Sequence, residues 1–139
     1  MEDQLLSELA SIQADIGGWV ILPNHYHVLV GAQSLPQISA ALKHLHGTTA
    51  RVWNLEDSVT GRRRVWYRFR DRYVRNERHY YQVLNYLHYN AMKHGYSESP
   101  YDWPWSSVHF YFDTYGQQWL REQWVRYPLD GTWQLGDEP

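Results

Sequence analysis

The feature of this sequence that most constrains its fold is a dense apolar run from Trp19 to Val30, rich in Val, Ile and Leu. Such a run is typical of a buried β-strand, and Pro23 predicts a bend within it. Only the polar cluster Asn24–His27 interrupts the run. The pattern therefore predicts that two histidines lie in the middle of the core.

His25 and His27 are two residues apart, and strand side chains alternate between faces, so both imidazoles should point the same way. Two convergent histidines make a partial metal site that needs at least one further ligand. The same spacing also fits hydrogen-bonded histidines of a core or a surface. The apolar flanks favour the metal site, because burying imidazoles without partners is costly.

The amino-acid composition limits which side chains could form a functional site. The chain has no cysteine, which excludes disulfides, thiolate nucleophiles and cysteine zinc sites and leaves histidine, carboxylate and amide groups as ligands. Its 139 residues suffice for one compact domain. Since no apolar run approaches the roughly 18 residues of a membrane span, we expect neither an anchor nor a secretory leader, and hence a cytoplasmic protein.

Charge is unevenly distributed along the chain. The net charge of −2 argues against a strongly basic nucleic-acid binder, but residues 43–78 hold ten Lys or Arg against four acidic residues. That segment carries +6 and the remainder −8. Aromatic residues interleave with the charges, so the segment could neutralise phosphates and stack on unpaired bases. A solvated charged face beside ordinary core aromatics is the alternative.

The spacing of apolar residues and the positions of Gly and Pro predict two further helices and a strand. An amphipathic helix is predicted near residues 2–15, ended by Gly17 and Gly18. A second helix is expected over 34–54, with Ser34 as its cap and Pro36 in its first turn. Alternation then predicts a basic strand over 64–74.

A third helix has clear end signals. Asn76 suits the N-cap, Gly95 suits the C′ position, and Lys93 and His94 are favourably placed in the last turn. Residues 77–94 should therefore be helical. The core stripe of this helix is predicted to comprise Tyr80, Leu84, Leu87 and Ala91.

Tyr86 and Asn90 lie four residues apart, so the third helix presents a phenol and an amide on one face, off the core stripe. If that face packs over the histidine strand, Asn90 could complete a His-His-amide site for Mg²⁺ or Mn²⁺, with Tyr86 poised as a nucleophile. The alternative is that the tyrosines of this helix only pack, since the chain has twelve.

Three blocks in the same order resemble a known family. They are WVILPNHYHVLV at 19–30, LNYLHYNAMKHGY at 84–96 and DWPWSS at 102–107. Together they resemble the single-tyrosine HUH transposases, and within them the branch of REP-associated tyrosine transposases. The resemblance covers roughly residues 17–110.

The resemblance implies an α+β fold, ferredoxin-like, with an antiparallel sheet that bears the histidine pair and helices on one face. It implies that His25 and His27 bind metal, that Tyr86 attacks DNA, and that Asn90 is a third, amide-bearing ligand. We expect residues 1–110 to form the transposase-like domain and residues 111–139 a Trp-rich C-terminal extension.

The implied activity is metal-dependent nicking and strand transfer of single-stranded or hairpin DNA through a 5′-phosphotyrosine intermediate, with Mg²⁺ or Mn²⁺ as cofactor. A protein of this kind would associate with the nucleoid when bound to DNA. Phosphate contacts are predicted for Lys43, Arg51, Arg62, Arg63, Arg64, Arg68, Arg70 and Arg72.

Two features depart from the family pattern. Family members carry a strand ahead of the first helix, whereas residues 1–16 are predicted to be helical, so that first strand is expected to be missing. The resulting open edge favours a truncated copy, a decayed copy, or pairing with a second chain as a homodimer. The other departure, Ala91-Met92 where Pro and Val are more usual, is mild because Ala and Met are good helix formers.

Other functions fit less of the sequence. A truncated, catalytically inactive protein that still binds DNA hairpins is the main alternative. A zinc hydrolase would need an acidic residue, and a histidine-triad hydrolase a third histidine, where Leu29 stands. A protein-interaction role for the aromatic tail rests on composition alone.

Overall fold

The computed structural model describes residues 1–31, 35–56 and 74–130, which form two compact units. One unit comprises Met1–Ile16 together with the segment that starts at Val30, and the other comprises Gly17–Leu29 together with the segment that starts at Arg72. Among the described residues, no helix is long and apolar enough to cross a membrane.

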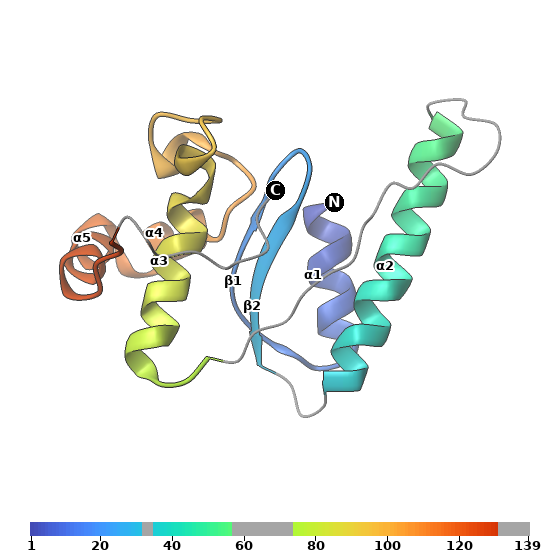
Figure 1. The fold of residues 1–139 in the computed structure, drawn as a ribbon, viewed down its shortest axis with the longest axis horizontal. Coiled ribbons are helices and arrows are strands. Elements are labelled where there is room, and N and C mark those ends of the chain that lie inside the picture. Colours follow the sequence, from blue (N-terminus) through green and yellow to red (C-terminus); the bar gives the residue numbers. More distant parts are fainter. Residues whose placement is uncertain (32–34, 57–73, 131–139) are drawn as a thin grey trace. The chain divides into compact units, whose positions relative to one another are not determined.

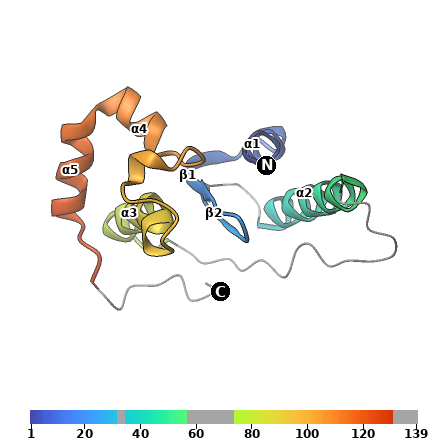
Figure 2. The same ribbon diagram turned by 90° about the horizontal axis from the view of Figure 1, so that it is seen from above.

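Two helices dominate the first unit. Helix α1 (Glu2–Ser11) contacts helix α2 (Leu35–Glu56), as Figures 1 and 2 show. Leu5 and Leu9 of α1 are fully buried, and Leu42 and Leu45 of α2 are buried as well. The predicted second helix is thereby confirmed, because its apolar stripe faces a core.

The predicted end of the first helix is wrong. Helix α1 ends at Ser11, and Gln13 follows in the left-handed region with φ of 58°. Gly17 and Gly18 lie instead in strand β1 (Asp15–Ile21). A Cβ on Gly17 would stand 2.5 Å from the Tyr80 hydroxyl, so this glycine permits close approach of a helix and does not end one.

The apolar run predicted as one strand is a hairpin. Among the described residues, strand β1 pairs with strand β2 (Tyr26–Gly31) in a two-stranded antiparallel sheet (Figure 1). The amide of Leu22 donates to the carbonyl of His25 at 2.8 Å and closes the turn. Pro23 lacks an N–H group and fits this turn better than the middle of a strand. The polar cluster therefore lies at the turn and the start of β2.

Helix α3 (Glu77–Lys93) packs against this hairpin within the second unit. Asn76 caps it as predicted, since its Oδ1 accepts a hydrogen bond from the His79 amide at 2.8 Å, and Gly95 follows with φ of 77°. The shared core cluster joins both elements and comprises Val20, Leu22, Leu29, Val83, Leu84, Leu87 and Ala91.

The C-terminal elements attach to α3 and β1. Helices α4 (Val108–Tyr115) and α5 (Gln117–Arg126) meet at Gly116, whose φ is 89°, and a short 3₁₀ helix, η1 (Pro100–Asp102), precedes them. The Asn85 amide of α3 donates to the carbonyls of Gln123 and Tyr127. These described parts of the predicted extension are thus packed on α3, while the division of the chain at residue 110 stays a prediction.

Candidate functional site

The histidine pair converges as predicted, although it lies beside a turn. The rings of His25 and His27 stand edge to face with centroids 5.0 Å apart. His27 is 9% exposed. Nδ1 of His25 lies 2.7 Å from Oδ1 of Asn24, which orients the ring and directs its other nitrogen elsewhere.

Helix α3 and its C-cap residue meet the histidine pair at two points. The ring of Tyr86 lies 6.1 Å from that of His27, and the ring of His94 lies 5.2 Å from that of His25. Asn90 lies four residues from each of Tyr86 and His94 in sequence and is fully buried, so helical spacing places it on the same side of α3 as Tyr86. The second unit therefore brings together His25, His27 and Tyr86, with Asn90 one helical turn from Tyr86.

The potential metal-binding atoms of this cluster suit a divalent metal ion. Nε2 of His25, Nε2 of His27 and Oδ1 of Asn90 are buried atoms for which the described part of the chain provides no hydrogen bond. All three residues nonetheless have interaction partners in the protein. Imidazole nitrogens are common ligands of divalent metal ions, and an amide oxygen is a ligand that Mn²⁺ and Mg²⁺ prefer.

Within the ranges that the structure describes, no three His, Cys, Asp or Glu side chains gather as a metal cluster. A metal ion with two histidines and one amide as its protein ligands would keep open positions for water or substrate. Open positions are the usual mark of a catalytic metal site rather than a structural one.

Tyr86 is held in a defined orientation. Its side chain is 2% exposed, and Nζ of Lys93 donates a hydrogen bond to its hydroxyl at 2.7 Å. The same ammonium lies 4.9 Å from the centre of the Tyr86 ring. From the sequence, Lys93 was predicted only to be favourably placed in the last helical turn. The contact with Tyr86 could have been predicted from their spacing of seven residues, which puts both on one face of the helix two turns apart.

A second polar cluster holds α3 to β1. Nε2 of His88 lies 2.8 Å from the hydroxyl of Ser107, which also accepts a hydrogen bond from the Trp19 amide at 3.0 Å. Burial, and then the nearby His109, lower the pKa of His88 to about 3. His88 is therefore neutral at physiological pH and bridges a helix to a strand.

The block at 102–107 anchors the same strand. The indole of Trp103 donates to the Ile21 carbonyl at 2.8 Å, and Ser106 bridges Val20 along one edge of β1. The recognisable residues of this block thus support the strand that precedes the histidine turn. Their role in this structure is to position β1.

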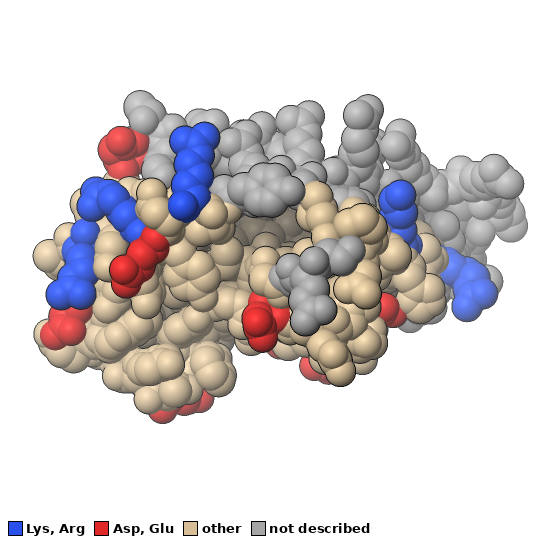
Figure 3. Space-filling view, turned by 90° about the horizontal axis from the view of Figure 1, so that it is seen from below, with Lys and Arg blue, Asp and Glu red and all other residues tan. Residues whose placement is uncertain are grey.

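The predicted DNA contacts are only partly described. Lys43 and Arg51 are exposed on α2. The predicted basic strand and the arginines at 62, 63, 64, 68, 70 and 72 lie outside the described residues. On the face drawn in Figure 3, the described residues carry charged side chains of both signs, and some of the blue and red groups at the left of the view adjoin one another.

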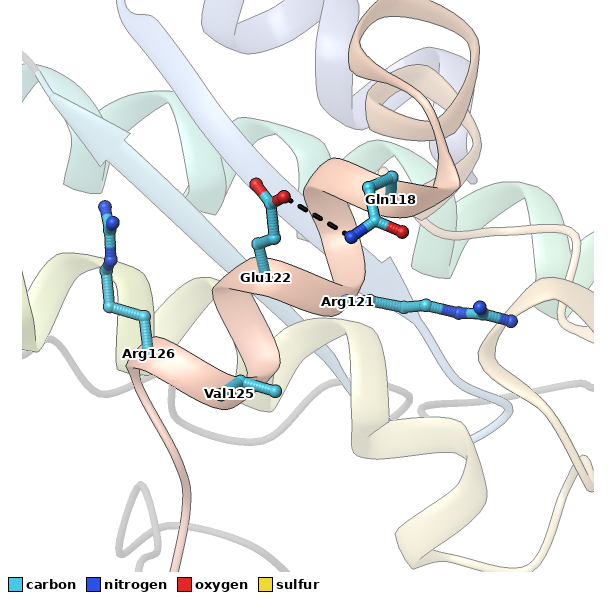
Figure 4. Close-up of a pocket in the computed structure, with 5 residues that line it drawn as sticks. All are labelled: Gln118, Arg121, Glu122, Val125 and Arg126. Atoms are coloured by element: carbon cyan, nitrogen blue, oxygen red, sulfur yellow. Dashed lines mark hydrogen bonds between the residues drawn. The ribbon is translucent and has the colours of Figure 1, made fainter.

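A surface hollow of about 460 Å³ lies on α5, and none of the histidines lines it. Gln118, Arg121, Glu122, Val125 and Arg126 line it, and all five belong to α5 (Figure 4). The Gln118 amide donates to Glu122 at 3.4 Å. Because one helix supplies the whole lining, with Val125 82% exposed, the hollow is an open helix face and lacks convergent polar groups.

Comparison with solved structures shows the fold class. A REP-associated tyrosine transposase bound to a REP hairpin superimposes with a TM-score of 0.64 and 21% sequence identity, over 81% of this chain and 65% of that one. The predicted α+β fold is thereby confirmed. No protein-family model matches the chain.

Sequence relatives carry the same name. The chain is 28% identical over 99 residues to the REP-associated tyrosine transposase of Escherichia coli (strain K12), which covers 68% of this chain and 54% of that protein. It is 29% identical over 98 residues to a Haemophilus influenzae protein provisionally described in the same way, of which 56% is covered. The chain spans about half the length of these curated relatives. The predicted resemblance to REP-associated tyrosine transposases is confirmed.

Proposed function

We propose that this chain is a metal-dependent transposase that nicks and joins single-stranded or hairpin DNA through a 5′-phosphotyrosine intermediate. The observation that carries the proposal is the position of α3, which places Tyr86 beside His27, while its C-cap residue His94 lies beside His25. A nucleophile beside a candidate metal site is what phosphoryl transfer by this route requires.

His25, His27 and Asn90 are the residues that would hold the metal ion. When bound there, a divalent ion would neutralise charge on the scissile phosphate. Burial of the three donor atoms favours this assignment, because an ion in a shielded place interacts more strongly with a phosphate than one in bulk water. The rings of His25 and His27 are nearly perpendicular, so their nitrogens can approach one metal ion from different directions.

Tyr86 would perform the covalent step. Its hydroxyl oxygen forms a bond to phosphorus while the bond between phosphorus and the 3′ oxygen breaks. The phenol proton passes to water, and the departing 3′ oxygen takes up a proton, so charge and atoms balance. Because the phosphotyrosine ester conserves the bond energy, another 3′ hydroxyl can reverse the step and join a strand.

Access to Tyr86 is part of this mechanism. With its side chain 2% exposed, the phenol oxygen meets a phosphate only after neighbouring side chains give way on DNA binding. Adduct formation would therefore include a conformational step as well as chemistry, and its rate would respond to how the DNA binds.

The proposed substrate follows from the solved relative. That transposase is bound to a REP hairpin, and we propose a hairpin or single strand as the ligand of this chain too. The exposed Lys43 and Arg51 are candidate phosphate contacts, together with the six arginines between 62 and 72. The acidic balance elsewhere would confine such contacts to this part of the sequence.

The test is covalent capture of DNA. Purified protein is mixed with labelled single-stranded hairpins from the flanks of its own gene, with Mn²⁺ or with EDTA, and adducts that resist denaturant are counted. We expect a metal-dependent adduct that Tyr86→Phe abolishes. Tyr89→Phe is the matched control, because Tyr89 lies on the same helix but packs against Trp124.

The other outcomes separate the alternatives. Hairpin binding without an adduct under any metal would support the inactive hairpin-binding protein and refute the nuclease. An adduct that survives Tyr86→Phe would assign the nucleophile to another residue. An adduct that forms equally in EDTA would refute metal dependence.

A further inference from the structure

The Lys93 ammonium lies against the phenol that the proposed mechanism uses as nucleophile. We propose that Lys93 is a positioning residue for Tyr86: it fixes the direction of the phenol oxygen and keeps a positive charge beside it during nicking and joining. This inference rests on the proposed function and adds a residue to it. The contact that supports it is the 2.7 Å hydrogen bond from Nζ to the Tyr86 hydroxyl.

The hydrogen bond defines the position of Nζ. It holds Nζ 2.7 Å from the hydroxyl oxygen and thereby 4.9 Å from the ring centre. A side chain with four rotatable bonds loses considerable entropy when it is fixed in this way. A surface lysine at the end of a helix would otherwise extend into water or toward the last carbonyls.

The location of Lys93 also suits a substrate that carries negative charge. Tyr86 is buried, whereas Lys93 is an exposed residue, so the phenol oxygen bonds a side chain that solvent reaches. A phosphodiester approaching that oxygen would pass an ammonium group. The ring of His27 lies on the other side of this contact, 6.1 Å from the phenol ring between centroids.

The chemical role follows from where charge develops. In nicking, the phenol oxygen gains negative charge as its proton passes to water and its bond to phosphorus forms. In joining, the incoming 3′ hydroxyl loses a proton to water, the bond between phosphorus and the phenol oxygen breaks, and that oxygen is protonated. A fixed cationic donor stabilises this oxygen in both directions, because charge-assisted hydrogen bonds are the stronger ones.

The test compares the rate of adduct formation with the affinity for DNA. Single-turnover adduct formation is measured at saturating hairpin in Mn²⁺ for the full chain, for Lys93→Met and for Lys93→Arg. We expect Lys93→Met to slow the adduct by about 100-fold or more, as loss of one oriented donor does in other active sites. The hairpin dissociation constant should change by no more than about threefold, and Lys93→Arg should restore much of the rate.

Controls distinguish positioning from folding and from general charge. Arg121→Met removes a cation from α5 and should leave the rate unchanged. Thermal unfolding of each variant shows whether the helix is intact, and Lys93→Gln, which retains an uncharged donor, replaces Lys93→Met if the latter is destabilised. A partial effect of Lys93→Gln would separate the hydrogen bond from the charge.

The outcomes that overturn this inference differ from those that overturn the function. If wild type forms an adduct and Lys93→Met forms it within twofold of the same rate, Lys93 has no positioning role but the nuclease proposal stands. If rate and affinity fall together, or Lys93→Arg fails to rescue, Lys93 is a DNA contact or a packing residue. If wild type forms no adduct, both proposals fail.

Discussion

The imidazole of His27 lies edge-on to the ring of Tyr86, with 6.1 Å between centroids and 75° between planes. The contact joins the second strand of the hairpin to the middle of α3. It is therefore the point at which a candidate metal ligand and a candidate nucleophile, 59 positions apart in the chain, become neighbours.

Removing either histidine should weaken metal binding. We expect His25→Ala and His27→Ala each to reduce Mn²⁺ affinity by at least about tenfold, because loss even of groups that merely orient a ligand costs that much. Titration calorimetry or Mn²⁺ resonance without DNA measures this. His44→Ala is the control, since His44 pairs with Glu8 in the other unit. Unchanged affinity in both site variants would argue against a metal at this place.

Asn90 offers a sharper comparison at a buried position, since it is 0% exposed. Asn90→Asp preserves an oxygen and adds charge, so Mn²⁺ affinity should be retained or increased. Asn90→Ala removes the oxygen, and affinity should fall by about tenfold or more. Equal affinities in the two variants would mean that this side chain is not a ligand.

His88 should make stability depend on pH. Its pKa is about 3 in the folded chain against 6.5 for an ordinary histidine. Between these values the unfolded chain binds a proton that the folded chain does not, so the free energy of unfolding falls as pH decreases from about 6.5 toward 3. Urea unfolding at several pH values measures the slope, and His88→Gln should reduce it. An identical slope in that variant would assign the pH dependence to other groups.

Two glycines should respond to alanine in opposite directions. A Cβ on Gly18 would stand 2.7 Å from the Leu84 side chain and 3.2 Å from the Ser107 hydroxyl, so Gly18→Ala should destabilise the protein by about 1–3 kcal/mol. Gly47 lies inside α2 with open space around it, and Gly47→Ala should stabilise by about 0.5–1 kcal/mol. Urea midpoints check both. Destabilisation by Gly47→Ala would contradict the described packing of α2.

The ends and the buried face of helix α3 could be predicted from local sequence alone. Asn76 and Gly95 predicted its ends, and the stripe of Leu84, Leu87 and Ala91 is buried as expected. Helix caps depend on residues within one turn of each other, so the sequence contains the whole signal. The shared face of Tyr86 and Asn90 follows from the same regularity.

The hairpin shows where local signals are insufficient. Trp19–Val30 was expected to form one strand, and Gly17 and Gly18 were expected to end a helix. A proline suits a bend or a turn, and a glycine suits a helix end or a close contact, so neither residue type decides between the two. Packing of α3 on β1 makes the choice, because only glycines leave room for Tyr80 and Leu84.

The sequence by itself determined the limits of α3 and the face shared by Tyr86 and Asn90, because helix periodicity assigns a direction to each side chain. The convergence of His25 and His27 was predicted from strand alternation, but His25 lies in the turn before β2, so the hairpin brings the two rings together. Only the tertiary structure decided that His27 meets Tyr86 and that Lys93 turns back to the phenol oxygen. Contacts between distant segments depend on how whole elements pack, and a long side chain chooses its partner only after that packing is complete.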